Sequence, residues 1–247
     1  MESLFNMIFK RKSFHVFKNP GHLTQEVLQE IETHFQLLQP LKDDIQVELK
    51  IVPKEETSCR RGEYCVLFFS EKSDGYLKNI GYLGAQLDLW LASKNVGVCW
   101  YGVGKTEITA ENNLDFVIMM AIAKVNENDF RKDYTKSKRK PIENLWFGET
   151  YQNIAKIVRF TPSACNTQPW FVESKDNQLF VYRIRGKRGI MPADKVVYYN
   201  RIDMGIFLLF MELSLKQQGI AFTRTVFSDT IDEKERVLSA KYTTNHS

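Results

Sequence analysis

Two parts of this chain carry the same order of elements, and this internal similarity constrains the fold more than any other feature. In each part a helical segment precedes strand-like segments, a long apolar helix, a glycine and a further strand. A shift of 122 residues superposes Leu87 on Leu209, Leu91 on Leu213, Lys94 on Lys216, Gly97 on Gly219 and Val98 on Ile220. The similarity predicts an internal duplication of one structural unit.

Hydrophobic periodicity predicts a mixture of helices and strands. Apolar residues recur at helical spacing in segments 23–38, 79–94, 151–160 and 203–218, with Thr24 as an expected N-cap and Gly97 and Gly219 as expected helix ends. Alternating or β-branched runs predict strands at 47–52, 64–70, 98–100, 116–125, 171–173, 179–185 and, as the closing element, 221–227. The fold class expected from this order is α+β.

Composition narrows the classes of function. The 34 basic residues nearly balance the 30 acidic ones, which gives no reason to expect nucleic-acid binding or a polybasic membrane anchor. The longest apolar run, 116–123, is too short to span a bilayer. The four cysteines show no paired ligand spacing, so we expect reduced thiols, no metal site and a cytoplasmic protein.

One apparent nucleotide motif fails on its spacing. Residues 102–106 read GVGKT, like the end of a phosphate-binding P-loop, but that loop needs a glycine where Cys99 stands. Glu107 occupies the position of the third glycine of a dinucleotide fingerprint. The sequence therefore argues against both kinds of nucleotide loop.

The segment from Thr161 to Trp170 is the most informative for chemistry. Its sequence, TPSACNTQPW, follows a predicted helix and combines a hydroxyl, a small residue and two amides. Amide side chains both donate and accept hydrogen bonds, which suits a planar heterocycle with an imide edge and a polyol chain. The alternative is a helix-to-strand turn in which Trp170 anchors the core.

TPSACNTQPWFV resembles the PSxxNxQPW signature of the FMN-dependent nitroreductase family. Three further stretches resemble elements of that family: FKRKSFHVF its N-terminal RRSxRxF element, GYLGAQLDLWLASKNVGVCWYGVG its central helix and glycine-rich loop, and SKRKPIENLWFGE its late RxPLEE segment. Together these stretches cover most of residues 8–220. The resemblance implies a nitroreductase-like α+β fold with central mixed sheets flanked by helices.

The order of these elements differs from that of the typical family member, in which PSxxN follows the Arg-Ser element by about one helix. Typical members are homodimers with flavin sites at the interface, and this chain resembles two such subunits fused, as in the branch of putative TM nitroreductases. The first half, 1–145, keeps Arg11-Lys12-Ser13, and the second, 146–247, keeps PSACN. The resemblance implies a single-chain pseudo-dimer with one FMN site, acting as a monomer or a weak homodimer.

The resemblance also assigns roles to residues. Arg11, Arg139 and Lys140 would hold the FMN phosphate; Ser13, Ser163 and Asn166 suit the ribityl chain and ring edge; and the Trp100-Tyr101-Gly102 turn would direct backbone N–H groups at the flavin. His15 stands where the family usually has Arg or Lys and would modulate the flavin potential. The remaining residues of the implied site are Lys12, Pro162, Ala164 and Gln168.

The implied activity is NADH- or NADPH-dependent, FMN-mediated ping-pong reduction of small organic acceptors such as nitroaromatics or quinones. The flavin would carry the chemistry, with no catalytic acid or base from the protein. Two alternatives stay open: a flavin-binding protein of little turnover that acts in storage or sensing, and a chain that has lost FMN binding.

Overall fold

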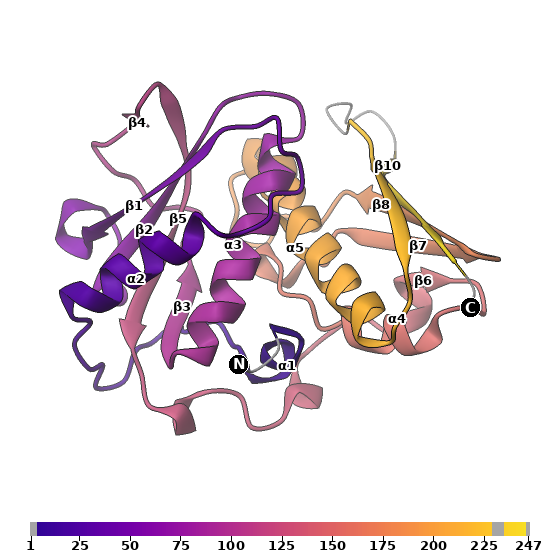
Figure 1. Ribbon diagram of the computed structural model, residues 1–247, viewed down its shortest axis with the longest axis horizontal. Helices are drawn as coiled ribbons and strands as arrows, with labels where there is room; N and C mark the ends of the chain where they lie inside the picture. Colours follow the sequence, from indigo (N-terminus) through magenta and orange to yellow (C-terminus); the bar gives the residue numbers. More distant parts are fainter. Residues whose placement is uncertain (1–3, 229–234, 246–247) are drawn as a thin grey trace. The chain divides into compact units, whose positions relative to one another are not determined.

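The computed structural model describes residues 4–228 and 235–245, and it divides into two compact units (Figure 1). Unit 1 comprises Met1–Tyr76 and Leu83–Tyr134, and unit 2 comprises Leu77–Tyr82 and Thr135–Ser247. Each unit contains a five-stranded sheet with helices packed against it. The α+β fold class expected from the sequence is confirmed.

The sheet of unit 1 has the strand order β1-β2-β5-β3, with β4 paired to β5. All of these pairs are antiparallel. The strands are β1 (Val47–Pro53), β2 (Tyr64–Ser70), β3 (Val96–Trp100), β4 (Ala110–Glu111) and β5 (Leu114–Lys124), and the helices are α1 (Leu4–Lys10), α2 (Gln25–Phe35) and α3 (Tyr76–Ser93).

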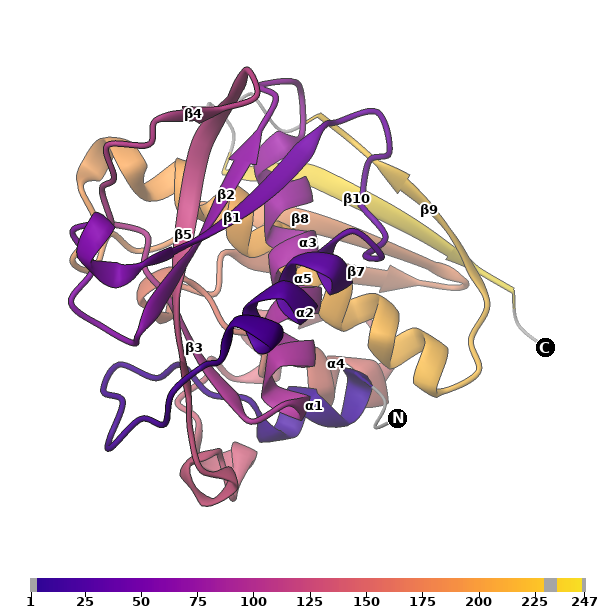
Figure 2. The same cartoon turned by 60° about the vertical axis from the view of Figure 1, so that its left-hand side comes forward.

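Both faces of this sheet are buried, which explains why β2 and β5 are almost wholly apolar. On one face Phe68 packs edge-on against Phe35 of α2, and His34 of α2 stacks on Trp90 of α3. The opposite face carries Cys65, Leu67 and Phe69, because successive side chains of a strand alternate between faces. Figure 2 shows β1, β2 and β5 side by side, with α2 and α3 next to them.

The sheet of unit 2 has the order β6-β7-β8-β10-β9. It is mixed, because β6 pairs with β7 in parallel and the other pairs are antiparallel. The strands are β6 (Trp146–Phe147), β7 (Trp170–Lys175), β8 (Gln178–Ile184), β9 (Phe222–Val226) and β10 (Arg236–Thr244), and the helices are α4 (Gln152–Val158) and α5 (Val196–Gln217). Trp170 stacks on Phe207 at 4.8 Å between ring centroids, which joins β7 to α5.

Within unit 2, glycines allow the first turns of α3 to approach α5 closely. A Cβ added to Gly81 would lie 2.0 Å from the carbonyl oxygen of Ile202, and one added to Gly205 would lie 1.9 Å from the carbonyl oxygen of Lys78. No side chain fits at either position, so the two backbones are in direct contact there.

Most predicted elements are present, and the exceptions are at helix ends and termini. The predicted start of the last long helix at 203 is wrong, because α5 begins at Val196. Gly97 does not end the preceding helix: α3 ends at Ser93, and Asn95 takes the left-handed conformation with φ of 57°. Gly219 does follow α5 with φ of 69°, so the 122-residue alignment is two residues out of register at the helix ends. The segment 221–227 contains β9 but is not the last strand of the chain, because β10 follows it in the sequence and pairs between β8 and β9.

Candidate functional site

The PSACNTQ segment forms a tight turn in unit 2 between α4 and β7. Residues Ala164–Asn166 make one 3-10 turn, and Cys165, Asn166 and Gln168 all have positive φ, from 48° to 56°. Asparagine tolerates this left-handed conformation better than most residues, whereas cysteine and glutamine adopt it less readily. Ser163 stabilises the turn, because its Oγ accepts a hydrogen bond from the Gln168 N–H at 2.9 Å.

The basic segment that precedes the turn by some 25 residues lies directly against it. Arg139 Nη1 donates to Asn166 Oδ1 at 2.8 Å, and Asn166 Nδ2 donates to the Lys138 carbonyl at 2.9 Å. Lys140 donates from its backbone N–H to Gln168 Oε1 at 2.8 Å and from Nζ to the Gln168 carbonyl at 2.9 Å. Four of the residues predicted for the site, Arg139, Lys140, Asn166 and Gln168, are therefore brought together within unit 2.

The charge of a further lysine acts on Lys140. Burial and the positive charge of Lys187 lower the pKa of Lys140 below its usual value. Lys187 belongs to the loop after β8, and this loop packs closely on the turn, because a Cβ added to Gly186 would lie 2.8 Å from the Cβ of Thr167. Two lysines held near one another favour an anion between or beside them.

Helix α5 fixes the turn from its buried side. Asp203 Oδ1 accepts a hydrogen bond from the Ala164 N–H at 2.8 Å, and Asn200 Oδ1 accepts one from the Gly186 N–H at 2.9 Å. Asp203 is 3% exposed, and its other oxygen, Oδ2, has no hydrogen-bond partner among the described residues. Burial raises the pKa of Asp203 to about 7.

In unit 1 the predicted Arg-Ser element runs along β3. Ser13 forms a parallel bridge with Val98, and the Phe14 N–H donates to the Val98 carbonyl at 2.9 Å. Arg11 is buried, and its Nη2 lies 3.2 Å from Oδ2 of Asp88. Trp100 Nε1 donates to the same carboxylate oxygen at 3.1 Å. Arg11 and Trp100, both predicted for the site, thus meet at one buried carboxylate that the sequence analysis did not single out.

His15 is hydrogen-bonded to a second arginine, Arg61. Arg61 Nη1 donates to His15 Nδ1 at 2.8 Å, and the Arg61 guanidinium carbon lies 5.5 Å from the centre of the Tyr101 ring. Desolvation, together with the charges of Arg61 and then of Arg11, lowers the pKa of His15. The lowered pKa favours the neutral form of the imidazole, and Arg61 supplies a positive charge beside it.

The Trp100-Tyr101-Gly102 turn is present, but one of its N–H groups is used within the sheet. The Tyr101 N–H donates to the Met119 carbonyl at 2.9 Å, so the ladder between β3 and β5 continues one residue beyond β3. The Tyr101 carbonyl accepts from the Gly104 N–H at 3.0 Å, which closes the turn. Among the other predicted residues, Lys12 contacts an aromatic ring: its Nζ lies 4.5 Å from the ring centre of Phe14. Pro162 is half-buried beside Ser163.

Sequence reasoning missed Arg61, Lys187, Asp203 and Asp88. Asp88 and Asp203 had a usable signal, because a charged residue inside an apolar helical stripe must find a partner when it is buried. The sequence contains no such signal for Arg61 or Lys187, because each lies in a polar loop whose contacts form only when the chain folds. Among the described residues, no group of three metal-ligating side chains lies close enough to hold an ion, and no helix is both long and apolar enough to cross a membrane.

Comparisons with known proteins confirm the nitroreductase-like fold expected from the sequence. Residues 3–215 match the model of the family described as Putative TM nitroreductase. The crystal structure of a putative nitroreductase from Thermotoga maritima MSB8 has a TM-score of 0.62 at 16% identity, covering 98% of this chain and 93% of that one. An FMN-dependent nitroreductase from Clostridium difficile R20291 matches 55% of this chain and 98% of its own, at 16% identity and a TM-score of 0.39. Comparison with curated proteins gives no match.

Proposed function

Because the chain belongs to the family of putative TM nitroreductases, a family of oxidoreductase type, we propose that it binds FMN and uses it to reduce small organic acceptors. The observation that supports the proposal most strongly is the convergence of the SKRK and PSACNTQ segments in unit 2. These stretches are separate in the sequence, at residues 137–140 and 162–168, and they share four hydrogen bonds.

The donor set of unit 2 fits a phosphate-bearing ligand. The Lys140 ammonium has three N–H donors and uses one for the Gln168 carbonyl, and Lys187 lies near enough to affect its titration. A dianionic phosphate would relieve the repulsion between these two lysines through charge-assisted hydrogen bonds. Arg139 then has a different role from the one first expected: it orders Asn166 and the turn. We assign the phosphate to Lys140 and Lys187 and keep Ser163, Asn166 and Gln168 for the polar groups of the flavin.

Unit 1, taken by itself, also carries residues that the family resemblance assigns to a flavin. Ser13 and the Trp100-Tyr101-Gly102 turn stay assigned to the flavin, and the positive charge of Arg61 would do what an Arg or Lys at position 15 does in relatives. When bound, FMN would supply the transfer of two electrons from NADH or NADPH to an acceptor such as a nitroaromatic or a quinone, in two alternating half-reactions. The protein would hold the flavin, orient the electron donor and the acceptor against it, and provide the surrounding charge.

The first experiment asks whether the purified protein carries or takes up FMN, read as flavin absorbance after gel filtration, and whether NADH or NADPH bleaches it without oxygen. Bleaching, followed by recovery of absorbance on addition of a quinone, is the expected result. Flavin that neither nicotinamide reduces would instead identify a storage or sensing protein. Failure to bind added FMN would refute both functions.

The second experiment tests the phosphate assignment by comparing FMN with riboflavin, which lacks the phosphate. Lys187→Met should weaken FMN binding about 10- to 100-fold, the loss of one charge-assisted hydrogen bond, and leave riboflavin binding nearly unchanged. Lys156→Met, which removes an exposed lysine of α4, is the matched control. Equal weakening of FMN and riboflavin would show that Lys187 acts on the fold of the loop and not on the phosphate.

We further propose that the chain binds one FMN, as a pseudo-dimer with one retained site. Only one PSxxN segment and one Arg-Ser segment occur in the chain. Titration of the protein with FMN should therefore end at one equivalent per chain, and a value of two would refute the single-site arrangement. Sedimentation at the same concentrations would distinguish a monomer from a homodimer.

A further inference from the structure

The sheets of the two units share one topology over four strands, and they differ at one edge. The order β1-β2-β5-β3 of unit 1 corresponds to β7-β8-β10-β9 of unit 2, with α3 or α5 after the second strand. In unit 2 a further strand, β6, pairs in parallel with β7. In unit 1 no strand occupies the corresponding position beyond β1, among residues 4–228 and 235–245. The outer edge of β1 is therefore a place where a sheet of this topology accepts another strand.

The backbone of β1 presents open hydrogen-bonding groups along this edge. The Glu71 N–H donates to the Gln46 carbonyl at 3.1 Å just before the strand begins, and the register with β2 then continues without a bulge. Even-numbered residues of β1 consequently exchange hydrogen bonds with β2, because these bonds alternate along an antiparallel strand. The N–H and C=O groups of the odd-numbered residues, Val47, Leu49 and Ile51, point outward, and none of them has a hydrogen-bond partner in the described part of the chain.

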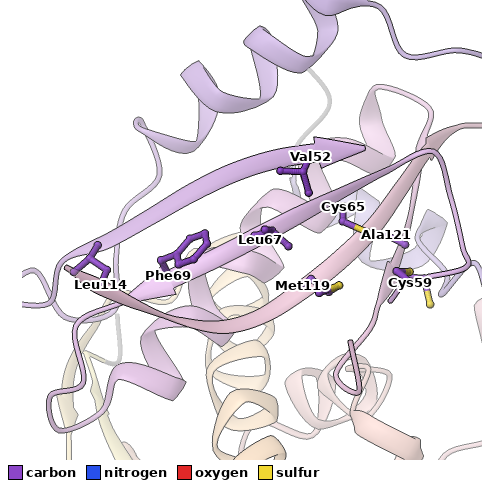
Figure 3. Packing of buried hydrophobic residues seen from close by; sticks show 9 residues of the cluster. Val52, Cys59, Cys65, Leu67, Phe69, Leu114, Met119 and Ala121 are labelled. Atoms are coloured by element: carbon purple, nitrogen blue, oxygen red, sulfur yellow. The ribbon is translucent and has the colours of Figure 1, made fainter. Parts of the chain in front are cut away.

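The side chains of β1 alternate between the two faces of the sheet. Val52 belongs to an apolar cluster on the face opposite α2, which also contains Leu67 of β2, and Figure 3 shows its side chain among those of the cluster. Glu48 and Lys50 lie on the same face as Val52, since every second residue of a strand shares a face. Apart from Val52, which is buried, and Pro53, which is exposed, the residues of β1 are half-buried.

We propose that β1 pairs with β1 of a second copy of this chain, antiparallel and about a two-fold axis at Leu49. In this register Val47 lies opposite Ile51 of the partner subunit, and the outward groups of the two strands form about six hydrogen bonds. Glu48 lies opposite Lys50 of the partner subunit, and Lys50 lies opposite the partner's Glu48. The edge is thus complementary to itself both in its backbone groups and in its charges.

The two charged residues also select this register. A two-fold axis at Glu48 would place that carboxylate directly opposite the partner's Glu48, and an axis at Lys50 would oppose two ammonium groups in the same way. Like charges directly opposite one another destabilise a strand pair, whereas unlike charges stabilise it. The axis at Leu49 avoids both repulsions and places its apolar side chains together on the other face.

Both charged side chains already have a contact within the chain, and each contact leaves room for the partner. Lys50 Nζ lies 2.8 Å from Glu111 Oε2, and Asn112 Nδ2 donates to Glu48 Oε2 at 2.8 Å. An ammonium group has three N–H donors and a carboxylate has two oxygens, so each group can keep its own contact and bind across the interface. Pairing of two short strands buries little area, so we expect a weak dimer with a dissociation constant of about 10–100 µM.

Charge reversal on β1 tests the pairing, with sedimentation velocity over a range of concentrations as the measurement. Glu48→Lys places lysines opposite lysines, and Lys50→Glu places glutamates opposite glutamates. Each variant alone should have a dissociation constant at least about tenfold larger than that of the wild type. An equal mixture of the two variants restores both unlike-charge pairs, so a heterodimer of near wild-type affinity should form. Lys156→Glu, the same change of charge at an exposed lysine of α4, is the matched control and should dimerise like the wild type.

Three results would overturn the proposal. The first is a wild-type chain that stays monomeric up to about 500 µM, well above the expected dissociation constant. The second is a dimer that both single variants keep, because its interface would lie elsewhere. The third is an equal mixture that stays monomeric although both variants have the circular dichroism of the wild type. The double variant Glu48→Lys with Lys50→Glu, in which unlike charges again face one another, should dimerise and so covers the case in which one single variant fails to fold. All of these measurements use chain without flavin, so they are independent of the flavin assignment.

Discussion

Arg11 and Asp88 form an ion pair in the interior of unit 1, with Nη2 and Oδ2 3.2 Å apart and both side chains 4% exposed. Burial raises the pKa of Asp88, and the charge of Arg11 opposes that rise. Such a pair makes each partner depend on the other, because removal of one leaves an uncompensated buried charge. Arg11 therefore supports the fold of unit 1 whatever it contributes to a flavin site.

Arg11→Met should lower the free energy of unfolding by about 3–5 kcal/mol, the loss expected for breaking a buried ion pair. Urea denaturation followed by circular dichroism measures it. The matched control is Lys72→Met, which removes the exposed pair between Lys72 and Asp115 and should change stability by about 0–1 kcal/mol. Equal effects of the two substitutions would contradict a structural role for the Arg11–Asp88 pair.

Asp203→Asn should change how stability depends on pH. The pKa of Asp203 is about 7 in the folded chain, against about 3.9 when unfolded, so the folded state binds the extra proton between these values. Stability contributed by this group is therefore lost as the pH rises from about 4 to about 7, and it stays constant above that range.

The asparagine variant lacks this loss, so it should gain stability relative to wild type as the pH rises from 4 to 8, by up to about 4 kcal/mol. Denaturation at pH 4, 6 and 8 checks it, with Asp176→Asn, an exposed residue of unit 2, as the control. A difference between variant and wild type that is the same at all three pH values would contradict a buried, titrating Asp203.

Arg61→Ala should raise the pKa of His15. The substitution removes the second-largest of the causes that lower this pKa and opens the ring to water, which reduces the largest, desolvation. Titration of the imidazole by NMR measures the change. Arg60→Ala, which removes the neighbouring exposed arginine, should leave the titration unchanged; a shift of the same size in both variants would show a general effect of charge and no specific contact.

Gly205→Ala should destabilise unit 2 by more than about 3 kcal/mol, because its new methyl group would lie 1.9 Å from the Lys78 carbonyl oxygen. Gly219→Ala meets nothing within 4 Å and differs only in its φ of 69°, so it should lose about 1–2 kcal/mol. Thermal or urea unfolding compares the two. A larger loss for Gly219→Ala would mean that the close approach of α3 and α5 is not maintained.

Several elements could be predicted because their own residues specify them. The run of β-branched and aromatic residues in β2 gave its bounds to the residue, Tyr64–Ser70. The start of α5 was missed because Val196, Val197, Tyr198 and Tyr199 favour strands, and only packing within unit 2 holds them in a helix. β10 was missed because its alternation is interrupted by a register shift between Leu238 and Ala240.

In the candidate site, the sequence identifies several residues but not the contacts between them. Asn166, Gln168, Arg139 and Lys140 could be found from motifs, since each motif occupies consecutive positions. Their mutual hydrogen bonds could not, because those contacts join positions 28 residues apart and depend on how the chain between them folds. Arg61 is the extreme case: it reaches His15 from 46 residues away, out of a loop with no recognisable pattern.

The close contact between Gly81 and α5 has a consequence for how this chain could have changed over time. Residues 77–82 belong to unit 2, although they lie in the sequence between two segments of unit 1. A recombination event that replaced everything after residue 134 with a homologous segment would leave the old residues 77–82 against a new α5. The incoming segment would therefore need a glycine at the position of Gly205, because any side chain there would meet the backbone of the old residues 77–82.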